Sequence, residues 1–366
     1  MELQIRAGVC YAMFAYDIGL AIDLEEAARR TMEATEPETI RHKRRAPEWL
    51  EFRPAPLRVI QTGAPVSIAG FTTGARVESV LYDFGAVSVA YAIPLSGPLS
   101  GLLALSDGLY ENRAPMEDSR RRVEEIMRRI ARAVDKPHIA DLVEDYAVYQ
   151  LQELEGVGGP VDAAAALEKE GRLLARVLRA EPGELSEQET ADALSSRIAY
   201  GPGEEAIIDW NAAVVMVREA EDVKTILEYA NVELLELRRL DDQLDSVLDR
   251  SYKALKPGRW PRSFRLTAGR ELRRIAELQM DSALLFEGVN NALKLVGDQY
   301  LARVYRLAAA RMHLPEWDTS ILRKLQTAES IYEKLSDQEV TRRMEALEWI
   351  IILLFAFEIG MTFLRR

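Results

Sequence analysis

One stretch constrains the fold of this chain more than any other: residues 222–255 run for about 35 residues without glycine or proline. Their apolar side chains recur mostly at steps of three and four residues, which is the spacing of one face of an α-helix. The pattern is carried by Leu227, Ala230, Leu234, Leu237, Leu244 and Leu248. The sequence therefore predicts a single long helix here.

The same spacing continues beyond a "KPGRWP" turn, over residues 265–312 and again over residues 322–335. Long periodic helices joined by short turns are typical of an antiparallel helical hairpin or a coiled coil. We therefore predict a long antiparallel hairpin over residues 264–346. Its last helix continues without glycine or proline into an apolar C-terminal segment.

The first 155 residues mix the patterns of strands and helices. Alternating or β-branched runs predict strands at residues 5–16, 58–70, 77–93 and 140–154. Gly85 interrupts the third run and indicates a hairpin or a bulge. Amphipathic patterns predict helices over residues 23–34 and 117–134. The glycine-rich "EGVGGP" at residues 155–160 then predicts a domain boundary.

The next segment is mostly helical in pattern. Residues 161–180 and 185–197 predict two helices, and the second opens with Ser186 followed by Glu189, the spacing of a capping box. Two short strands are predicted around Gly201-Pro202-Gly203. The predicted fold class is α+β, with a mixed α/β domain (1–155), a helical segment with a short β-hairpin (156–263), the long helical hairpin (264–346) and a C-terminal transmembrane helix (347–366).

Composition narrows the classes of function. The 47 Lys and Arg residues against 59 Asp and Glu residues give a net charge of −12, which argues against a dedicated nucleic-acid-binding protein unless the basic groups cluster. The single cysteine, Cys10, excludes an internal disulfide framework. Three scattered histidines leave little for a zinc site. We predict no metal and no cofactor.

The C-terminal segment is the most apolar part of the chain. Residues 349–364 carry one charge, Glu358. Ten Ile, Leu and Phe residues contribute roughly −3 to −6 kcal/mol to membrane insertion, against roughly +3 kcal/mol for one central acid. Trp349 at one end and Arg365 and Arg366 at the other are typical of interfacial anchors. The alternative is a buried C-terminal core helix, but residues 349–357 show no polar stripe.

These features predict a membrane protein with a single-pass C-terminal anchor. The apolar N-terminus has no basic leader and no cleavage site, and it carries Glu2, Arg6 and Asp17, so we interpret it as a strand rather than a signal peptide. The bulk of the chain is then predicted to be cytoplasmic. Glu358 would need a partner inside the membrane, most simply a second copy of the chain, or it would be protonated.

Three stretches carry a resemblance to a known family. They are "YANVELLELRRLDDQLDSVLDRSY" (229–252), "LSSRIAYGPGEEAIIDWNAAVVM" (194–216) and "RMEALEWIIILLFAFEIG" (343–360). Together they resemble the uncharacterised family that includes the required-for-meiotic-nuclear-division proteins. The resemblance covers most of the chain after about residue 185. It implies a helical hairpin that leads into one C-terminal membrane helix, with no established enzymatic activity, and a mitochondrial member implies support of translation at a membrane.

Two groups of acids are candidates for a functional site. Glu204, Glu205 and Asp209 could form a carboxylate cluster for acid–base or metal chemistry, but their turn context favours solvated acids. The acids of "RRLDDQLDSVLD" (238–249) share helix faces and could form a metal-binding ridge. A solvated or salt-bridged helix face is the favoured interpretation of that second group.

Two basic stretches remain. "RHKRR" (41–45) and the arginines of residues 118–132 could contact phosphate in lipid or RNA, although a solvated surface is the favoured interpretation. The sequence thus predicts a membrane-tethered, non-enzymatic scaffold or adaptor that assembles through its long helices. Its predicted partners are a second copy, membrane lipid and another protein. The alternatives are an acid-dependent, hydrolase-like enzyme and a ribosome or RNA adaptor at the membrane.

Overall fold

The computed structural model describes residues 2–32, 54–255, 276–280, 283, 299–331, 344, 348 and 350–352. The chain forms two compact units. Unit 1 comprises Met1–Arg239 and Ala283–Trp317, and unit 2 comprises Leu240–Ser282 and Asp318–Arg366.

The described elements are strands β1 (Gln4–Asp17), β2 (Ala21–Ile22), β3 (Leu57–Thr62), β4 (Ser67–Ile68), β5 (Phe71–Thr72), β6 (Arg76–Leu81), β7 (Ala86–Pro98), β8 (Val134–Asp135), β9 (Val143–Gly156), β10 (Gly159–Val161), β11 (Arg197–Ile198), β12 (Glu205–Ile208) and β13 (Ala212–Met216), and helices α1 (Leu24–Met32), α2 (Gly101–Leu109), α3 (Arg113–Ile130), η1 (Ala131–Ala133), α4 (Ala163–Arg179), α5 (Glu187–Ala193), α6 (Glu221–Leu255) and α8 (Gln299–Arg311).

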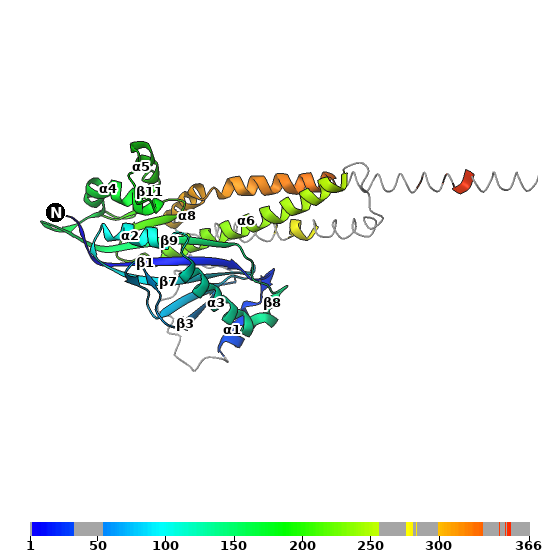
Figure 1. The fold of residues 1–366 in the computed structure, drawn as a ribbon, viewed down its shortest axis with the longest axis horizontal. Helices are drawn as coiled ribbons and strands as arrows, with labels where there is room; N and C mark the ends of the chain where they lie inside the picture. Colours follow the sequence, from blue (N-terminus) through cyan, green and yellow to red (C-terminus); the bar gives the residue numbers. More distant parts are fainter. Residues whose placement is uncertain are drawn as a thin grey trace, which may run out of the picture. The chain divides into compact units, whose positions relative to one another are not determined.

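Unit 1 is built on a nine-stranded sheet (Figure 1). Its strand order is β11-β12-β13-β9-β1-β7-β6-β3, and β10 pairs with β9. The long strand β1 lies between β7 and β9 and is antiparallel to both. Strand β13 runs parallel to β9, so β11–β13 extend the same sheet. The boundary predicted between residues 155 and 156 therefore falls inside one sheet.

The hairpin between β6 and β7 depends on Gly85. This residue has a φ of +96°, and a Cβ at this position would clash with the backbone of Gly19. Only glycine combines that backbone conformation with so close an approach. The structure confirms the predicted interruption at Gly85 and places it in the turn.

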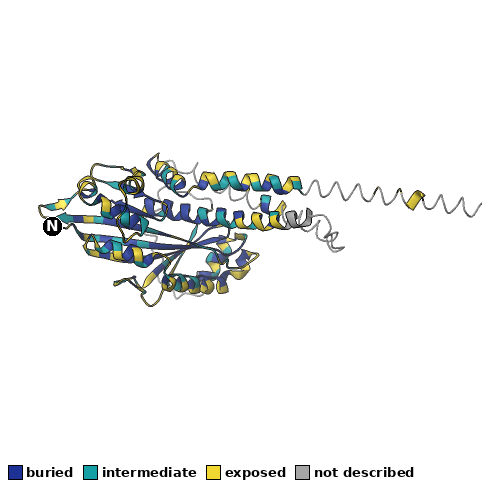
Figure 2. Cartoon of the chain, turned by 45° about the horizontal axis from the view of Figure 1, so that its top comes forward, coloured by how far each residue is buried: buried dark blue, intermediate teal, exposed yellow. Residues whose placement is uncertain are grey.

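One face of the sheet packs against α2, α3 and α4. Alternate side chains of β1, such as Phe14 and Tyr16, point into this core because successive side chains of a strand face opposite sides. They meet Leu102 of α2, Ile126 of α3 and Leu174 of α4. Dark blue strands and helix faces mark this buried layer in Figure 2.

Helix α6 covers the opposite face of the sheet. Lys224 lies 4.9 Å above the ring of Tyr11 in β1, and the Asn231 side chain donates to the backbone oxygen of Glu144 in β9. Residues 226–233 of this helix are all buried, because α8 also packs beside it through Tyr305, whose hydroxyl contacts Glu233 at 2.6 Å. The predicted long helix is confirmed, and its first half is a core element.

Unit 2 contains the second half of α6 and helical residues 318–331. Leu244 and Val247 are buried on α6, and Ile321, Leu325 and Ala328 are buried on the other helix at steps of three and four. Lys324 bridges Asp241 and Asp245, at 2.8 and 2.6 Å. Two of the acids in residues 238–249 are therefore salt-bridged on a helix face, as the favoured interpretation predicts.

The predicted transmembrane helix requires a correction. Across the residues that the structure describes, no helix is both long enough and apolar enough to cross a membrane. This finding contradicts the predicted single-pass anchor and membrane localisation. Of the predicted anchor, Glu348 and residues 350–352 are described and helical, while the rest, with most of the predicted hairpin, lies outside the described residues. The fold is a mixed α/β unit with a large sheet and several helices.

Candidate functional site

Asp209 is the candidate acid with the most structured surroundings. It follows β12 in the short turn before β13, and its side chain has no exposure to solvent. Its backbone N–H donates to Ala212 O at 2.9 Å, and its carboxylate accepts from the N–H of Trp210 at 2.9 Å. The hydroxyl of Tyr146 donates to its backbone oxygen. The turn thus points the carboxylate inward, which corrects the predicted solvated acid.

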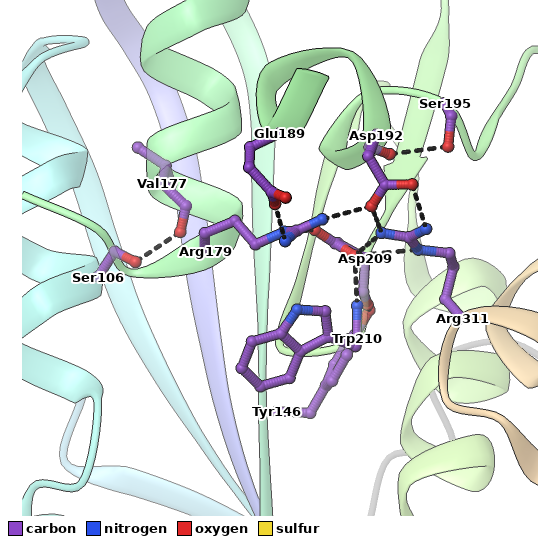
Figure 3. A network of polar contacts seen from close by, with 10 residues as sticks. All are labelled: Ser106, Tyr146, Val177, Arg179, Glu189, Asp192, Ser195, Asp209, Trp210 and Arg311. Carbon is purple, nitrogen blue, oxygen red and sulfur yellow. Dashed lines mark hydrogen bonds and ion pairs between the residues drawn. The ribbon is translucent and has the colours of Figure 1, made fainter. Parts of the chain in front are cut away.

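Two arginines from distant elements converge on that carboxylate (Figure 3). Arg179, the last residue of α4, donates its Nε–H to Oδ2 at 2.6 Å. Arg311, the last residue of α8, donates its Nε–H to Oδ1 at 3.0 Å, and its Nη2 contacts the same oxygen. Charge-assisted bonds of this kind are about twice as strong as neutral ones. Both oxygens of Asp209 are therefore occupied by cations.

Two acids of α5 complete the arrangement. Asp192 accepts from Arg179 at 2.6 Å and from Arg311 at 3.1 Å, while Glu189 accepts from Arg179 at 2.9 Å. The hydrogen bond from Arg311 is the main reason why the pKa of Asp192 lies below its ordinary value. Burial lowers the pKa of Arg179, but its bonds to Asp209 and Asp192 raise it overall. The five charges form a closed ionic network.

This arrangement suits a structural role better than a catalytic one. A general base needs a free lone pair within reach of substrate, whereas Asp209 is buried and accepts from two guanidinium groups. The network instead ties α4, α5 and α8 to the end of β12. Sequence reasoning found Asp209 but missed Arg179, Asp192 and Arg311, because the arginines lie 30 and 102 positions from Asp209.

Glu204 and Glu205 do not join Asp209. Glu204 accepts from the backbone N–H of Gly201 at 3.2 Å and so closes the Gly-Pro-Gly turn between β11 and β12. Glu205 is the first residue of β12, opposite Met216 of β13, while Asp209 follows the far end of that strand. The predicted three-acid cluster is therefore not brought together.

The predicted membrane and oligomer residues cannot be placed. Trp349, Glu358, Arg365 and Arg366 lie outside the described residues. Within the described part of the chain, no three His, Cys, Asp or Glu side chains are grouped so that they could hold a metal ion.

Residues 41–45 also lie outside the described part, so only the basic stretch on α3 can be placed. Its first half lines an open cleft of about 680 Å³, in which Arg120 lies 3.7 Å from Glu124 and Arg121 pairs with Asp118. Its second half exposes Arg128 and Arg129. The paired half of α3 thus offers no free cation for phosphate.

A second charged cluster, also missed from the sequence, lies beneath α6. Lys224 is almost completely buried, and its Nζ lies 3.1 Å from both Glu78 of β6 and Glu221 of α6. Arg58 of β3 contacts Glu78 at 2.6 Å, and the fully buried Glu228 lies one helical turn beyond Lys224. Burial raises the pKa of Glu228. This cluster fixes the start of α6 against the sheet.

Comparison with known proteins finds matches for about the first three fifths of the chain. Residues 7–222 match the family described as uncharacterized protein MJ0711, N-terminal domain. The uncharacterized protein MJ0711 of Methanocaldococcus jannaschii is 25% identical over 231 residues, which cover 61% of this chain and 67% of that protein. No solved structure matches the chain.

Proposed function

We propose a scaffold function for this chain, which belongs to the family of the uncharacterized protein MJ0711, N-terminal domain. In this proposal the protein is a non-enzymatic scaffold or adaptor, and copies of the chain assemble through the helices of unit 2. Unit 1 would then present its sheet and helices as a fixed body. The proposal concerns protein partners and no membrane.

The proposal is supported by the positions of the exposed apolar side chains. Unit 2 supplies few of the described residues, yet six of the large hydrophobic side chains with high exposure belong to it. They are Met280, Leu322, Met344, Ile350, Ile351 and Ile352. Exposed apolar side chains that gather in one part of a protein mark interaction sites. A second copy would bury them.

The enzyme alternative has less support. The acid it depends on most, Asp209, is buried and held by Arg179 and Arg311. Glu204 and Glu205 lie apart from it at the other end of β12. Nothing in this geometry offers a substrate both an acid and a base.

The RNA-adaptor alternative and the finer resemblance to the required-for-meiotic-nuclear-division proteins both stay predictions. The exposed Arg128 and Arg129 of α3 are compatible with a phosphate partner, but both stand near the C-terminal end of their helix. Cations stabilise a helix at that end without any ligand. Their placement therefore does not favour a nucleic-acid partner over ordinary helix stabilisation.

The proposal is tested by the mass of the full chain in solution, measured by size-exclusion chromatography with light scattering. We expect a mass of two or more copies of the 41.2 kDa chain. Leu322→Glu should shift the protein toward one copy, because it places a charge on an exposed apolar position of the assembly helix. Ser330→Glu adds the same charge to an exposed residue that is rotated away from Leu322 around the same helix, and it should leave the mass unchanged.

Two outcomes would count against assembly through unit 2. One is a parent chain that stays monomeric at tens of micromolar concentration. The other is a Leu322→Glu variant that keeps the parent mass.

A further inference from the structure

The large sheet of unit 1 ends in strand β3 (Figure 1). This strand pairs with β6 on one side, and no strand in the described part of the chain pairs with its other side. An edge strand presents a row of backbone N–H and C=O groups to which a further strand can bond. Because β3 belongs to unit 1, its outer edge is separate from the assembly surface proposed for unit 2.

The register decides which residues of β3 point outward. The strand lies opposite β6 residue by residue, from Leu57 against Leu81 to Thr62 against Arg76. One position further on, the N–H of Gly63 donates to Ala75 O at 3.0 Å, which marks a hydrogen-bonded pair. Such pairs alternate along an antiparallel ladder, so every second residue of β3 bonds to β6. The backbone N–H and C=O groups that point away from β6 are therefore those of Arg58, Ile60 and Thr62.

The side chains of these three residues share one face of the strand. Arg58 contacts Glu221, the first residue of α6, at 3.1 Å. Ile60, two positions further along, keeps 48% of its surface exposed. The opposite face carries Leu57 and Val59, which pack against the core. The edge thus combines outward-pointing backbone groups with a large apolar side chain that is half exposed.

Prolines limit the length of this edge. Pro56 comes directly before β3, and Pro65 follows shortly after its end. Proline has no N–H to donate, and its fixed φ does not suit the interior of a paired strand. The row of outward-pointing groups that a further strand can use is therefore centred on Ile60.

We propose that two copies of the chain pair their β3 strands antiparallel, about a twofold axis at Ile60. Each Ile60 then lies opposite its counterpart, and Arg58 of each copy lies opposite Thr62 of the other. These are hydrogen-bonded pairs, and each pair exchanges two backbone bonds. The two sheets become one continuous sheet, and the half-exposed isoleucines cover each other.

Other registers fit the edge less well. A twofold axis at Arg58 would set the two arginines directly opposite each other, which is destabilising. It would also set Ile60 against Pro56, which has no N–H to donate. An axis at Thr62 would move the pairing past the end of β3, toward Pro65. The axis at Ile60 uses all the outward-pointing groups of the strand and keeps the arginines apart, and this self-complementarity favours a second copy over an unrelated strand.

The contact should be weak on its own, because a pair of six-residue strands is short for a stable interface. We therefore expect it to form at hundreds of micromolar, above the tens of micromolar at which assembly through unit 2 is tested. A covalent link between copies can report such a weak contact.

A disulfide between copies tests the register in the full chain. Cys10 is buried, so in Ile60→Cys the introduced thiol is the exposed one. Opposite residues of a hydrogen-bonded pair have Cα atoms about 5.5 Å apart, which a disulfide can span. Ile60→Cys should therefore form a linked dimer under mild oxidation, measured on a non-reducing gel. Thr62→Cys is the matched control on the same face: its two thiols would lie on residues about 14 Å apart and should link at least about tenfold more slowly.

A second pair of variants tests the backbone pairing. The N–H of Thr62 points away from β6, so Thr62→Pro removes no hydrogen bond within the sheet. It does remove a donor that the second copy needs. The double variant Ile60→Cys/Thr62→Pro should therefore link about as slowly as Thr62→Cys. Thr62→Ala keeps the N–H, and Ile60→Cys/Thr62→Ala should link as fast as Ile60→Cys.

The same measurement in Leu322→Glu separates this contact from assembly through unit 2. Ile60→Cys should still link in that background, because β3 lies in unit 1. Equal rates for Ile60→Cys and Thr62→Cys would overturn the proposal. So would a rate that Thr62→Pro leaves unchanged, or linking that Leu322→Glu abolishes.

Discussion

Asp209 shows how a single buried residue can resemble a catalytic acid while serving a structural role. Its carboxylate is out of contact with water, yet two guanidinium groups and a backbone N–H satisfy it. The two arginines are not equivalent in the chain. Arg179 belongs to the segment that matches the family, whereas Arg311 lies beyond it. Asp209 therefore joins the family domain to a helix outside the matched segment.

Substitutions in this network should lower the free energy of unfolding by different amounts. Asp209→Asn leaves two largely buried arginines short of an anion and should lower the free energy of unfolding by about 3–5 kcal/mol. Arg311→Gln should cost only about 1–3 kcal/mol, because Arg179 still compensates Asp209. Chemical denaturation measures both. Glu184→Gln, on an exposed residue, should stay within about 0.5 kcal/mol of the parent. Equal losses for Asp209→Asn and Arg311→Gln would show that Arg179 does not compensate the carboxylate alone.

At the level of the element, α6 differs from an ordinary amphipathic helix. Residues 226–233 are all buried, and the buried charges Lys224 and Glu233 contact Glu78 of the sheet and Tyr305 of α8. Lys224 is the clearest case. Burial alone would raise the pKa of Glu78, but Lys224 and Arg58 lower it overall. The helix is thus positioned on the sheet by specific polar contacts as well as by apolar packing.

Replacing Lys224 with methionine should show how far the position of α6 depends on these polar contacts. Lys224→Met keeps most of the side-chain volume but removes the cation from Glu78, Glu221 and Glu228. We expect a loss of about 3–5 kcal/mol in the free energy of unfolding at pH 8. The loss should shrink at pH 5, because protonated carboxyl groups no longer need the cation. Arg218→Met, on an exposed residue, should change stability by less than about 1 kcal/mol at both pH values. A loss that is independent of pH would point to packing alone.

Local patterns predicted the elements well where the relevant partners are close in sequence. The cap of α5 is confirmed, since the Ser186 side chain accepts from the N–H of Glu189 at 3.1 Å. The turn at Gly85 and the extent of α6 follow equally from short-range spacing. Helix α2 was not predicted, because its short apolar sequence carries no polar face. The parallel pairing of β13 with β9 could not be inferred, since register between distant strands depends on tertiary packing.

The candidate site was predicted less well, for a related reason. An acid in a strand–turn–strand sequence gives no sign of whether arginines from two remote helices will reach it. The same holds for Asp17, whose partners His138 and Arg239 lie more than 100 positions away. Ion pairs of this kind leave no periodic signal in a single sequence.

At the scale of the whole chain, two compact units share one continuous helix. Ile321 of unit 2 is completely buried, so Ile321→Ala should leave a cavity and cost about 2–5 kcal/mol locally. Hydrogen exchange should show faster opening of residues 240–249 and 318–331, while β1 and β9 keep their protection. Ser330→Ala, at another exposed position of the same helix, should have little effect on either. Equal loss of protection in the sheet would show that the two units open as one.

The central position of β1 has a consequence for how the chain is made. One neighbour, β7, begins about 80 residues after β1 starts, and the other, β9, ends at Gly156. At about 5–20 residues per second, a ribosome needs on the order of ten seconds to finish that second neighbour. Throughout that time the apolar strand β1 has at least one unpaired edge. An unpaired edge is a template on which nascent chains can aggregate. The first strand to be synthesised, β1, is thus among the last to have both of its edges paired. We therefore expect the speed of synthesis and the availability of chaperones to govern the yield of folded protein.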